Sequence, residues 1–255
     1  PVLHDSPGVG ENLQDHLQYR LIYQLNQNIS TNVQLSSLLG KVQIGLDWLL
    51  FRGGPLSIGI NQGGLFTKVM PQSKTPDIQF HMATLSADMA GGQVHPFPGF
   101  TMSVCQLRPE SRGYVRIASP DPLVPPKMMA NYLSTQHDRD TSVAAVKFAR
   151  KLAQTGPLKA LIERELKPDN PQSDEDLLQF CRNNGATIFH PTGTCQMGPD
   201  HQANAVLDSK LRVRGVSGLR VVDCSAMPTV PSGNTNWPAV MLGEKASDLI
   251  LSEQN

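Results

Sequence analysis

Charge, aromatic residues and long apolar stretches are all scarce in this 255-residue chain. Charged residues make up 17% and aromatic residues 5%, and 22 basic side chains balance 22 acidic ones for a formal net charge of +0. A nucleic-acid-binding surface needs a local excess of Lys and Arg, which this balance argues against. No run of about 18 apolar residues occurs, so the sequence predicts no transmembrane segment.

Cysteines are few and unpaired in sequence. Cys105, Cys181, Cys195 and Cys224 form no C-x-x-C pair, and the chain is far larger than the small secreted domains that depend on disulfides. A mixed site of Cys181, His190 and Cys195 does not match zinc-ligand spacing, so we expect no metal. Reduced thiols and the lack of a signal peptide after Pro1 favour the cytoplasm. Because the first residue is not Met, we expect a segment upstream of Pro1, where any targeting signal would lie.

A complete nucleotide-binding fingerprint is also lacking. Residues 8–13 begin like G-x-G-x-x-G, but Leu13 stands where the third Gly or Ala belongs. No apolar strand precedes this stretch and no clear helix follows it, so we interpret it as a turn. The sequence contains neither a P-loop nor a G-x-S-x-G motif.

Periodicity and turn residues predict a mixed α+β chain. Apolar residues recur at helical spacing over 36–51, before Gly53-Gly54-Pro55. Strand-like runs separated by Gly and Pro indicate an antiparallel sheet. A capping box at Ser173–Asp176 precedes a helix that we expect Gly185 to end in the left-handed conformation. The predicted helices are 36–51, 138–154 (capped by Asp138), 158–166, 174–185 and 238–251; the predicted strands are 21–25, 78–85, 100–107, 114–119 and a buried strand at 219–223.

Two histidines have informative surroundings. His190 lies in an extended stretch that enters the loop Pro191-Thr192-Gly193, where glycine permits close approach of another group. A loop histidine of this kind is either a general base or a hydrogen-bonded structural residue. His16 lies among polar residues, and we interpret it as structural.

The segment before the last predicted helix is rich in polar residues. Asn234, Thr235 and Asn236 directly precede Trp237-Pro238, and proline is favoured at the start of a helix. These side chains either cap the helix or, with its positive N-terminal end, hold a ring of partial negative charge such as a reduced flavin. Asp223 ends an apolar run, where it either contacts a cofactor at a sheet edge or caps the following turn.

Several segments together resemble the glucose–methanol–choline (GMC) family of flavoprotein oxidoreductases, and its choline-dehydrogenase-like branch in particular. The similar segments, in chain order and over nearly the whole sequence, are PGVGENLQDH at 7–16, LRPESRGYVR at 107–116 with Asp121-Pro122 and 131–133, HPTGTCQMG at 190–198, 219–228 and 233–250. Agreement of several long motifs in order is far more specific than any one of them.

The resemblance implies an FAD enzyme of which this chain is the C-terminal half. Residues 21–185 would form an antiparallel-sheet substrate-binding domain flanked by helices. Residues 1–20 and 186–255 would complete a Rossmann-like FAD-binding domain whose N-terminal half, with the fingerprint, is absent here and would act as a partner.

The resemblance also assigns roles to particular residues. His190 would be the base that takes the proton of an alcohol while hydride passes to flavin N5. Asn234 falls 44 positions later, where the family places a second catalytic His or Asn, and would orient the hydroxyl. The flavin contacts would come from Asp223, Cys224, Asn234, Thr235 and Asn236, although many members have Ala at the position of Cys224.

Three functions are compatible with the sequence. The first is oxidation of a small-molecule alcohol to an aldehyde or ketone. The second is cyanohydrin cleavage by a lyase of the same fold, which uses the same loop histidine without net redox change. The third is a non-catalytic binding module without a flavin fingerprint, which would expose apolar patches and associate.

Overall fold

The computed structural model describes residues 2, 4–88 and 91–253, and their contacts form two units. The first unit contains the described residues of segments 1–17, 107–139 and 187–255. The second contains those of 18–106 and 140–186. Segment 107–139 groups with the two ends of the chain, whereas the predicted boundaries assign it to the substrate-binding domain; the roles of the predicted domains stay a prediction.

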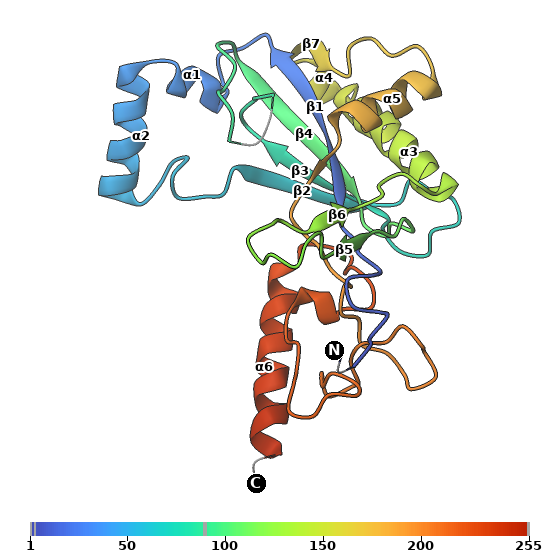
Figure 1. Cartoon of the computed structure of the whole chain (residues 1–255). Coiled ribbons are helices and arrows are strands. Elements are labelled where there is room, and N and C mark those ends of the chain that lie inside the picture. Colours follow the sequence, from blue (N-terminus) through green and yellow to red (C-terminus); the bar gives the residue numbers. More distant parts are fainter. Residues whose placement is uncertain (1, 3, 89–90, 254–255) are drawn as a thin grey trace. The chain divides into compact units, whose positions relative to one another are not determined.

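An antiparallel sheet forms the second unit, in the order β2-β3-β4-β1-β7 (Figure 1). Its strands are β1 (Leu17–Leu25), β2 (Asn61–Thr67), β3 (Ile78–Ala83), β4 (Gly99–Gln106) and β7 (Ile162–Lys167), and the short β8 (Ala186–Thr187) also pairs with β1. Tyr19 pairs with Val104, which pairs with Phe80, so these three side chains share one face. The predicted antiparallel sheet of an α+β fold is confirmed.

Helix α3 (Gln136–Ala153) covers that face of the sheet. The Tyr19 hydroxyl lies 2.7 Å from Ser142 Oγ, and the rings of Phe80 and Phe148 lie 5.9 Å apart. The small buried residues Ala145 and Ala149 let the helix approach the strands closely. Farther along, the Arg150 guanidinium donates to Glu165 of β7 at 2.9 Å.

The remaining helices of this unit are short or peripheral. They are α1 (Thr31–Leu35), α2 (Leu38–Phe51), α4 (Gly156–Lys159) and α5 (Asp174–Asn184). The predicted capping box of α5 is confirmed, because Ser173 Oγ accepts from Asp176 N and the Asp176 carboxylate accepts from Ser173 N. Of the residues of α2, only Ile44 is buried.

Two predictions in this unit are wrong. Residues 158–166 were expected to be helical, but helix α4 ends at Lys159 and strand β7 follows it. The side chains at 163–167 favour helix, yet strand pairing with β1 outweighs this small intrinsic preference. Gly185 was expected to be left-handed, but its φ of −67° and ψ of 136° are extended because the chain passes directly into β8. Strand β2 was not predicted, since Gly63 and Gly64 weaken its strand pattern.

Loops dominate the first unit. Its regular elements are the hairpin of β5 (Tyr114–Arg116) with β6 (Lys127–Met129), the 3-10 turn η1 (Cys224–Ala226) and α6 (Asn236–Ser252). A small core joins α6 to the loops before it: Val206, Leu207, Leu211, Ala226, Met227, Leu242 and Ala246. The turn at residues 7–10 is confirmed.

Two further predictions fail here. The expected buried strand at 219–223 makes one bridge, Arg212 to Arg220, and leaves Leu219 49% exposed, because the adjoining loop pairs with it at a single point. Asp138 does not cap α3; Thr135 Oγ1 accepts from Asp138 N, and the Asp138 carboxylate accepts from the backbone of Glu110 and Ser111 instead. Throughout residues 4–88 and 91–253, no helix combines the length and apolarity that crossing a bilayer requires.

Candidate active site

The loop that carries His190 pairs with the segment that contains the LQDH motif. Gln14 and Thr192 exchange backbone hydrogen bonds of 3.0 and 2.9 Å. Gly193 has a φ of +91°, and a Cβ there would lie 2.5 Å from the carbonyl oxygen of Asn12. The expected close approach at this glycine is therefore present, and any side chain would separate the two segments.

A third segment, η1, closes the other side of the loop. Backbone N–H groups of Gly193, Cys195 and Met197 donate to the carbonyls of Cys224, Ser225 and Ala226 at 3.3, 2.9 and 2.9 Å, in that order. The loop after His190 is thus held along its length by main-chain bonds on both sides.

Amide side chains of the LQDH region tie these segments to the chain that follows η1. Gln14 Nε2 donates to the carbonyl of Pro228 at 3.0 Å, and Gln14 Oε1 accepts from Val230 N at 3.2 Å. Asn12 Nδ2 donates to Gln196 Oε1 at 3.0 Å. Both amides link segments that lie about 180 or more positions apart in the sequence. Sequence periodicity does not detect contacts over such separations.

Asp15 anchors the backbone of His190. Its Oδ1 accepts from His190 N at 2.9 Å, and its Oδ2 accepts from the hydroxyls of Tyr132 and Thr187. Burial, then the hydrogen bond to Asp15, raises the pKa of Tyr132, so this phenol remains a donor to the carboxylate. Sequence reasoning missed Asp15 as a separate contributor, although the resemblance included its motif.

His190 is buried and contacts a polar group through each ring nitrogen. Its Nδ1 lies 3.0 Å from Nδ1 of His16, and its Nε2 lies 3.5 Å from Nδ2 of Asn234. Burial lowers the pKa of His190, and the negative charge of Asp15 opposes this only in part. The imidazole is consequently neutral at neutral pH and available to accept a proton.

His16 is the second residue that sequence reasoning missed. It is fully buried, and its Nε2 lies 3.2 Å from the carbonyl oxygen of Leu107. The sequence interpretation treated it as structural because nothing in the chain places residue 16 near residue 190. Its position in the LQDH motif was the only available signal.

The N-terminus of α6 brings Asn234, Thr235 and Asn236 together. Thr235 is the N-cap and is buried, but its side chain makes no capping hydrogen bond. The Thr235 side chain therefore does not cap α6, although one of the two sequence interpretations proposed that it would. Asn234 and Asn236 are exposed, and the N–H groups of the first helical turn have no acceptor within the helix.

Asp223 and Cys224 have local partners. Asp223 is exposed, and its Oδ1 accepts from Ser225 N at 2.7 Å, which caps η1 as one of the two sequence interpretations proposed. The half-buried Cys224 packs against the core beside α6, and burial followed by the charge of Asp223 raises its thiol pKa. Flavin contacts by either residue stay a prediction.

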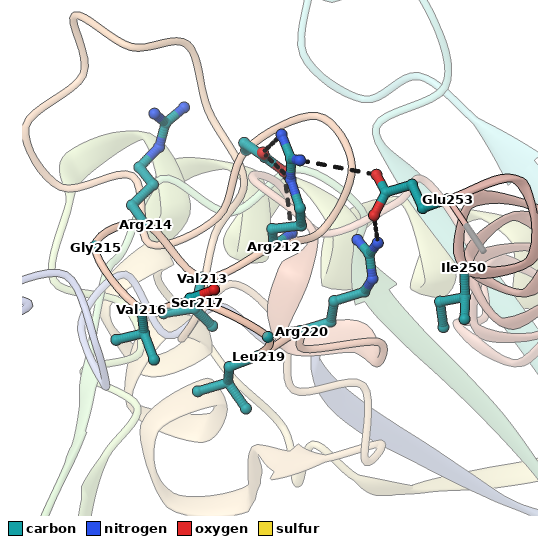
Figure 2. Close-up of a pocket in the computed structure, with 12 residues that line it drawn as sticks. Arg212, Val213, Arg214, Gly215, Val216, Ser217, Leu219, Arg220, Ile250 and Glu253 are labelled. Atoms are coloured by element: carbon teal, nitrogen blue, oxygen red, sulfur yellow. Dashed lines mark hydrogen bonds and ion pairs between the residues drawn. The ribbon is translucent and has the colours of Figure 1, made fainter. Parts of the chain in front are cut away.

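A separate cavity of about 710 Å³ lies between the 212–220 loop and the end of α6 (Figure 2). Glu253 pairs there with Arg220 and, at 3.8 Å, with Arg212, which also binds Asp208. These charges neutralise one another, and none of the six predicted site residues lines the cavity. Across the described segments, no cluster of three or more His, Cys, Asp or Glu side chains suited to a metal ion occurs, and none of the four cysteines forms a disulfide there.

Comparison with known proteins finds curated relatives that are named choline dehydrogenases. It is 37% identical over 255 residues to an oxygen-dependent choline dehydrogenase of Vibrio vulnificus (strain YJ016), covering 100% of this chain and 45% of that protein. The corresponding enzyme of Cronobacter sakazakii is 38% identical over 251 residues, or 98% of this chain and 44% of its own length. The chain therefore spans about half the length of these curated relatives.

Structural comparison agrees on the fold. A variant of the formate oxidase of Aspergillus oryzae RIB40, studied for its FAD modification, superposes with a TM-score of 0.88 at 23% identity, covering 98% of this chain and 48% of that one. The family model for GMC oxidoreductases matches residues 109–243, which is more than half of the sequence and includes His190 and Asn234. This chain belongs to the GMC oxidoreductase family.

Proposed function

We propose that the chain supplies the proton-accepting base and the hydroxyl-orienting amide for FAD-dependent oxidation of an alcohol to an aldehyde or ketone. The observation that carries the proposal is the arrangement of His190. Its Nε2 lies within 3.5 Å of the Asn234 amide, while its other nitrogen is occupied by His16. The curated relatives are named for choline, itself an alcohol, which supports this substrate class.

The residues beside His190 fit a flavin. The start of the 17-residue helix α6, where the Thr235 side chain makes no capping hydrogen bond, presents N–H donors and the positive end of the helix dipole, which suit a ring that gains electron density. Asn234 and Asn236 are exposed at this end, and Asp223 is exposed nearby along the chain, where a carboxylate can accept from a hydroxyl group. Because these 255 residues contain no complete fingerprint, we assign diphosphate binding to a separate flavin-binding half.

The chemistry of the chain's own residues is proton transfer and positioning. Neutral His190 accepts the hydroxyl proton at Nε2, and Asn234 donates to the substrate oxygen and orients it. A base in this position contributes roughly 10²–10⁴-fold to the rate. Bound FAD would supply the acceptor for the hydride that leaves the carbon.

The test compares His190→Ala with His201→Ala in the flavin-loaded protein that also contains the flavin-binding half; His201 is an exposed loop residue. We expect His190→Ala to slow flavin reduction by an alcohol roughly 10²-fold or more, with little change in the flavin Kd. The control should match the wild-type protein. Equal loss of flavin binding and reduction would make His190 structural, and an absence of alcohol-dependent flavin bleaching would favour the lyase.

A further inference from the structure

We infer that His16 is a positioning residue that fixes the tautomer of His190 and so keeps its Nε2 free of a proton. The inference rests on the proposed role of His190 as the base. It is carried by three polar contacts in series, from a main-chain carbonyl through His16 and His190 to Asn234.

The direction of the first contact is determined by chemistry. The carbonyl oxygen of Leu107 only accepts, so His16 Nε2, at 3.2 Å, carries a hydrogen. In a neutral imidazole the other nitrogen then has a lone pair and no hydrogen. Nδ1 of His16 is therefore an acceptor.

The second contact follows from the first. Nδ1 of His190 lies 3.0 Å from this acceptor, so it is the donor and holds the ring hydrogen. Nε2 of His190 is left with its lone pair, on the side of Asn234. A neutral histidine in water favours the opposite tautomer, with hydrogen on Nε2, which would prevent proton abstraction by that atom.

The alternative is a protonated His16, which would donate through both nitrogens and reverse the order. Burial argues against it, because His16 is 0% exposed and an imidazolium there would lose its hydration. Neutral His16 is therefore the form consistent with these contacts.

The two rings are also held from their backbones. They meet edge to face, with centroids 5.3 Å apart and planes at 84°. The carbonyl of His16 accepts from Ile188 N at 3.3 Å, two residues before His190, and Asp15 holds His190 N. Because hydrogen bonds of neighbouring residues hold both backbones, the two ring nitrogens stay within hydrogen-bonding distance, and this contact selects one tautomer of His190.

The experiment is nitrogen-15 NMR of the full chain labelled at histidine, which distinguishes protonated from unprotonated ring nitrogens without flavin or turnover. In the wild-type protein we expect His190 to show a protonated Nδ1 and a bare Nε2. His16→Leu removes the acceptor, and Nε2 of His190 should become protonated. His16→Gln keeps an acceptor oxygen and a donor N–H at about imidazole spacing, and should restore the wild-type pattern. His95→Gln is the matched control, since His95 hydrogen-bonds to Ser86 at 3.1 Å in the other unit.

The kinetic counterpart uses the flavin-loaded protein that also contains the flavin-binding half. We expect His16→Leu to slow flavin reduction roughly ten- to a hundred-fold and His16→Gln to recover most of this loss. A tautomer unchanged in His16→Leu would overturn the positioning role while leaving His190 as the base. A wild-type His190 with hydrogen on Nε2 would overturn both the positioning role and proton abstraction by that atom. Unchanged flavin reduction in His190→Ala would instead overturn the proposed function, whatever the tautomer.

Discussion

At the scale of single residues, the candidate site depends on one glycine. At Gly193 the φ of +91° and the Asn12 carbonyl oxygen, 2.5 Å from any added Cβ, exclude a side chain. We expect Gly193→Ala to lower the free energy of unfolding by about 1–3 kcal/mol and to reduce activity by displacing the His190 loop. Urea denaturation and the rate of flavin reduction measure the two effects. Gly243→Ala is the control, because an added Cβ at this position in α6 would have no atom within 4 Å; an equal loss there would refute the argument.

Burial of His190 also predicts a dependence of stability on pH. Its pKa is lowered in the folded chain, so the unfolded chain binds the proton more readily. Acid therefore favours unfolding, and stability should fall as the pH drops below about 6.5 towards the folded-state pKa. His190→Gln should flatten this part of the profile in urea titrations. An unchanged slope would mean that other groups account for it.

At the scale of elements, helix α5 depends on its capping box. Ser173 Oγ accepts from Asp176 N at 3.1 Å and satisfies a donor that has no partner within the helix. We expect Ser173→Ala to lower the free energy of unfolding by about 1 kcal/mol, as for other N-caps. Ser173→Thr keeps the acceptor and should stay close to wild type. Equal stabilities of the Ala and Thr variants in urea titrations would contradict the assignment.

At the scale of the whole molecule, the chain exposes a large apolar surface. On α2 and the loop after it, Leu39 is 83% exposed, Phe51 76% and Ile60 64%. These exposed apolar side chains belong to one helix and the loop that follows it, so we expect the chain to associate through them with increasing concentration. Leu39→Glu should reduce association in light scattering, whereas Gln43→Glu adds the same charge at an exposed polar position of the same helix and should have little effect. A wild-type chain that stays monomeric at all concentrations would refute this.

The sequence by itself determined those elements whose own residues contain the apolar pattern or the cap that predicts them. The helix at 38–51, the strands at 78–83 and 99–106 and the capping box at Ser173 lie where periodicity and cap chemistry predict them. In each case the apolar pattern or the cap lies within the element itself. The resemblance, resting on motifs in order along the chain, correctly indicated the family.

Only the tertiary structure decided the elements and contacts that depend on distant partners. Residues 162–167 have helix-forming side chains, yet they pair with β1 because main-chain hydrogen bonds at the sheet edge outweigh a small propensity. His16 and His190 lie 174 positions apart, and no local pattern encodes their 3.0 Å contact. The sequence supplies the two histidines. The direction of the hydrogen bonds between them depends on the carbonyl group that the fold places beside His16, because that oxygen can only accept.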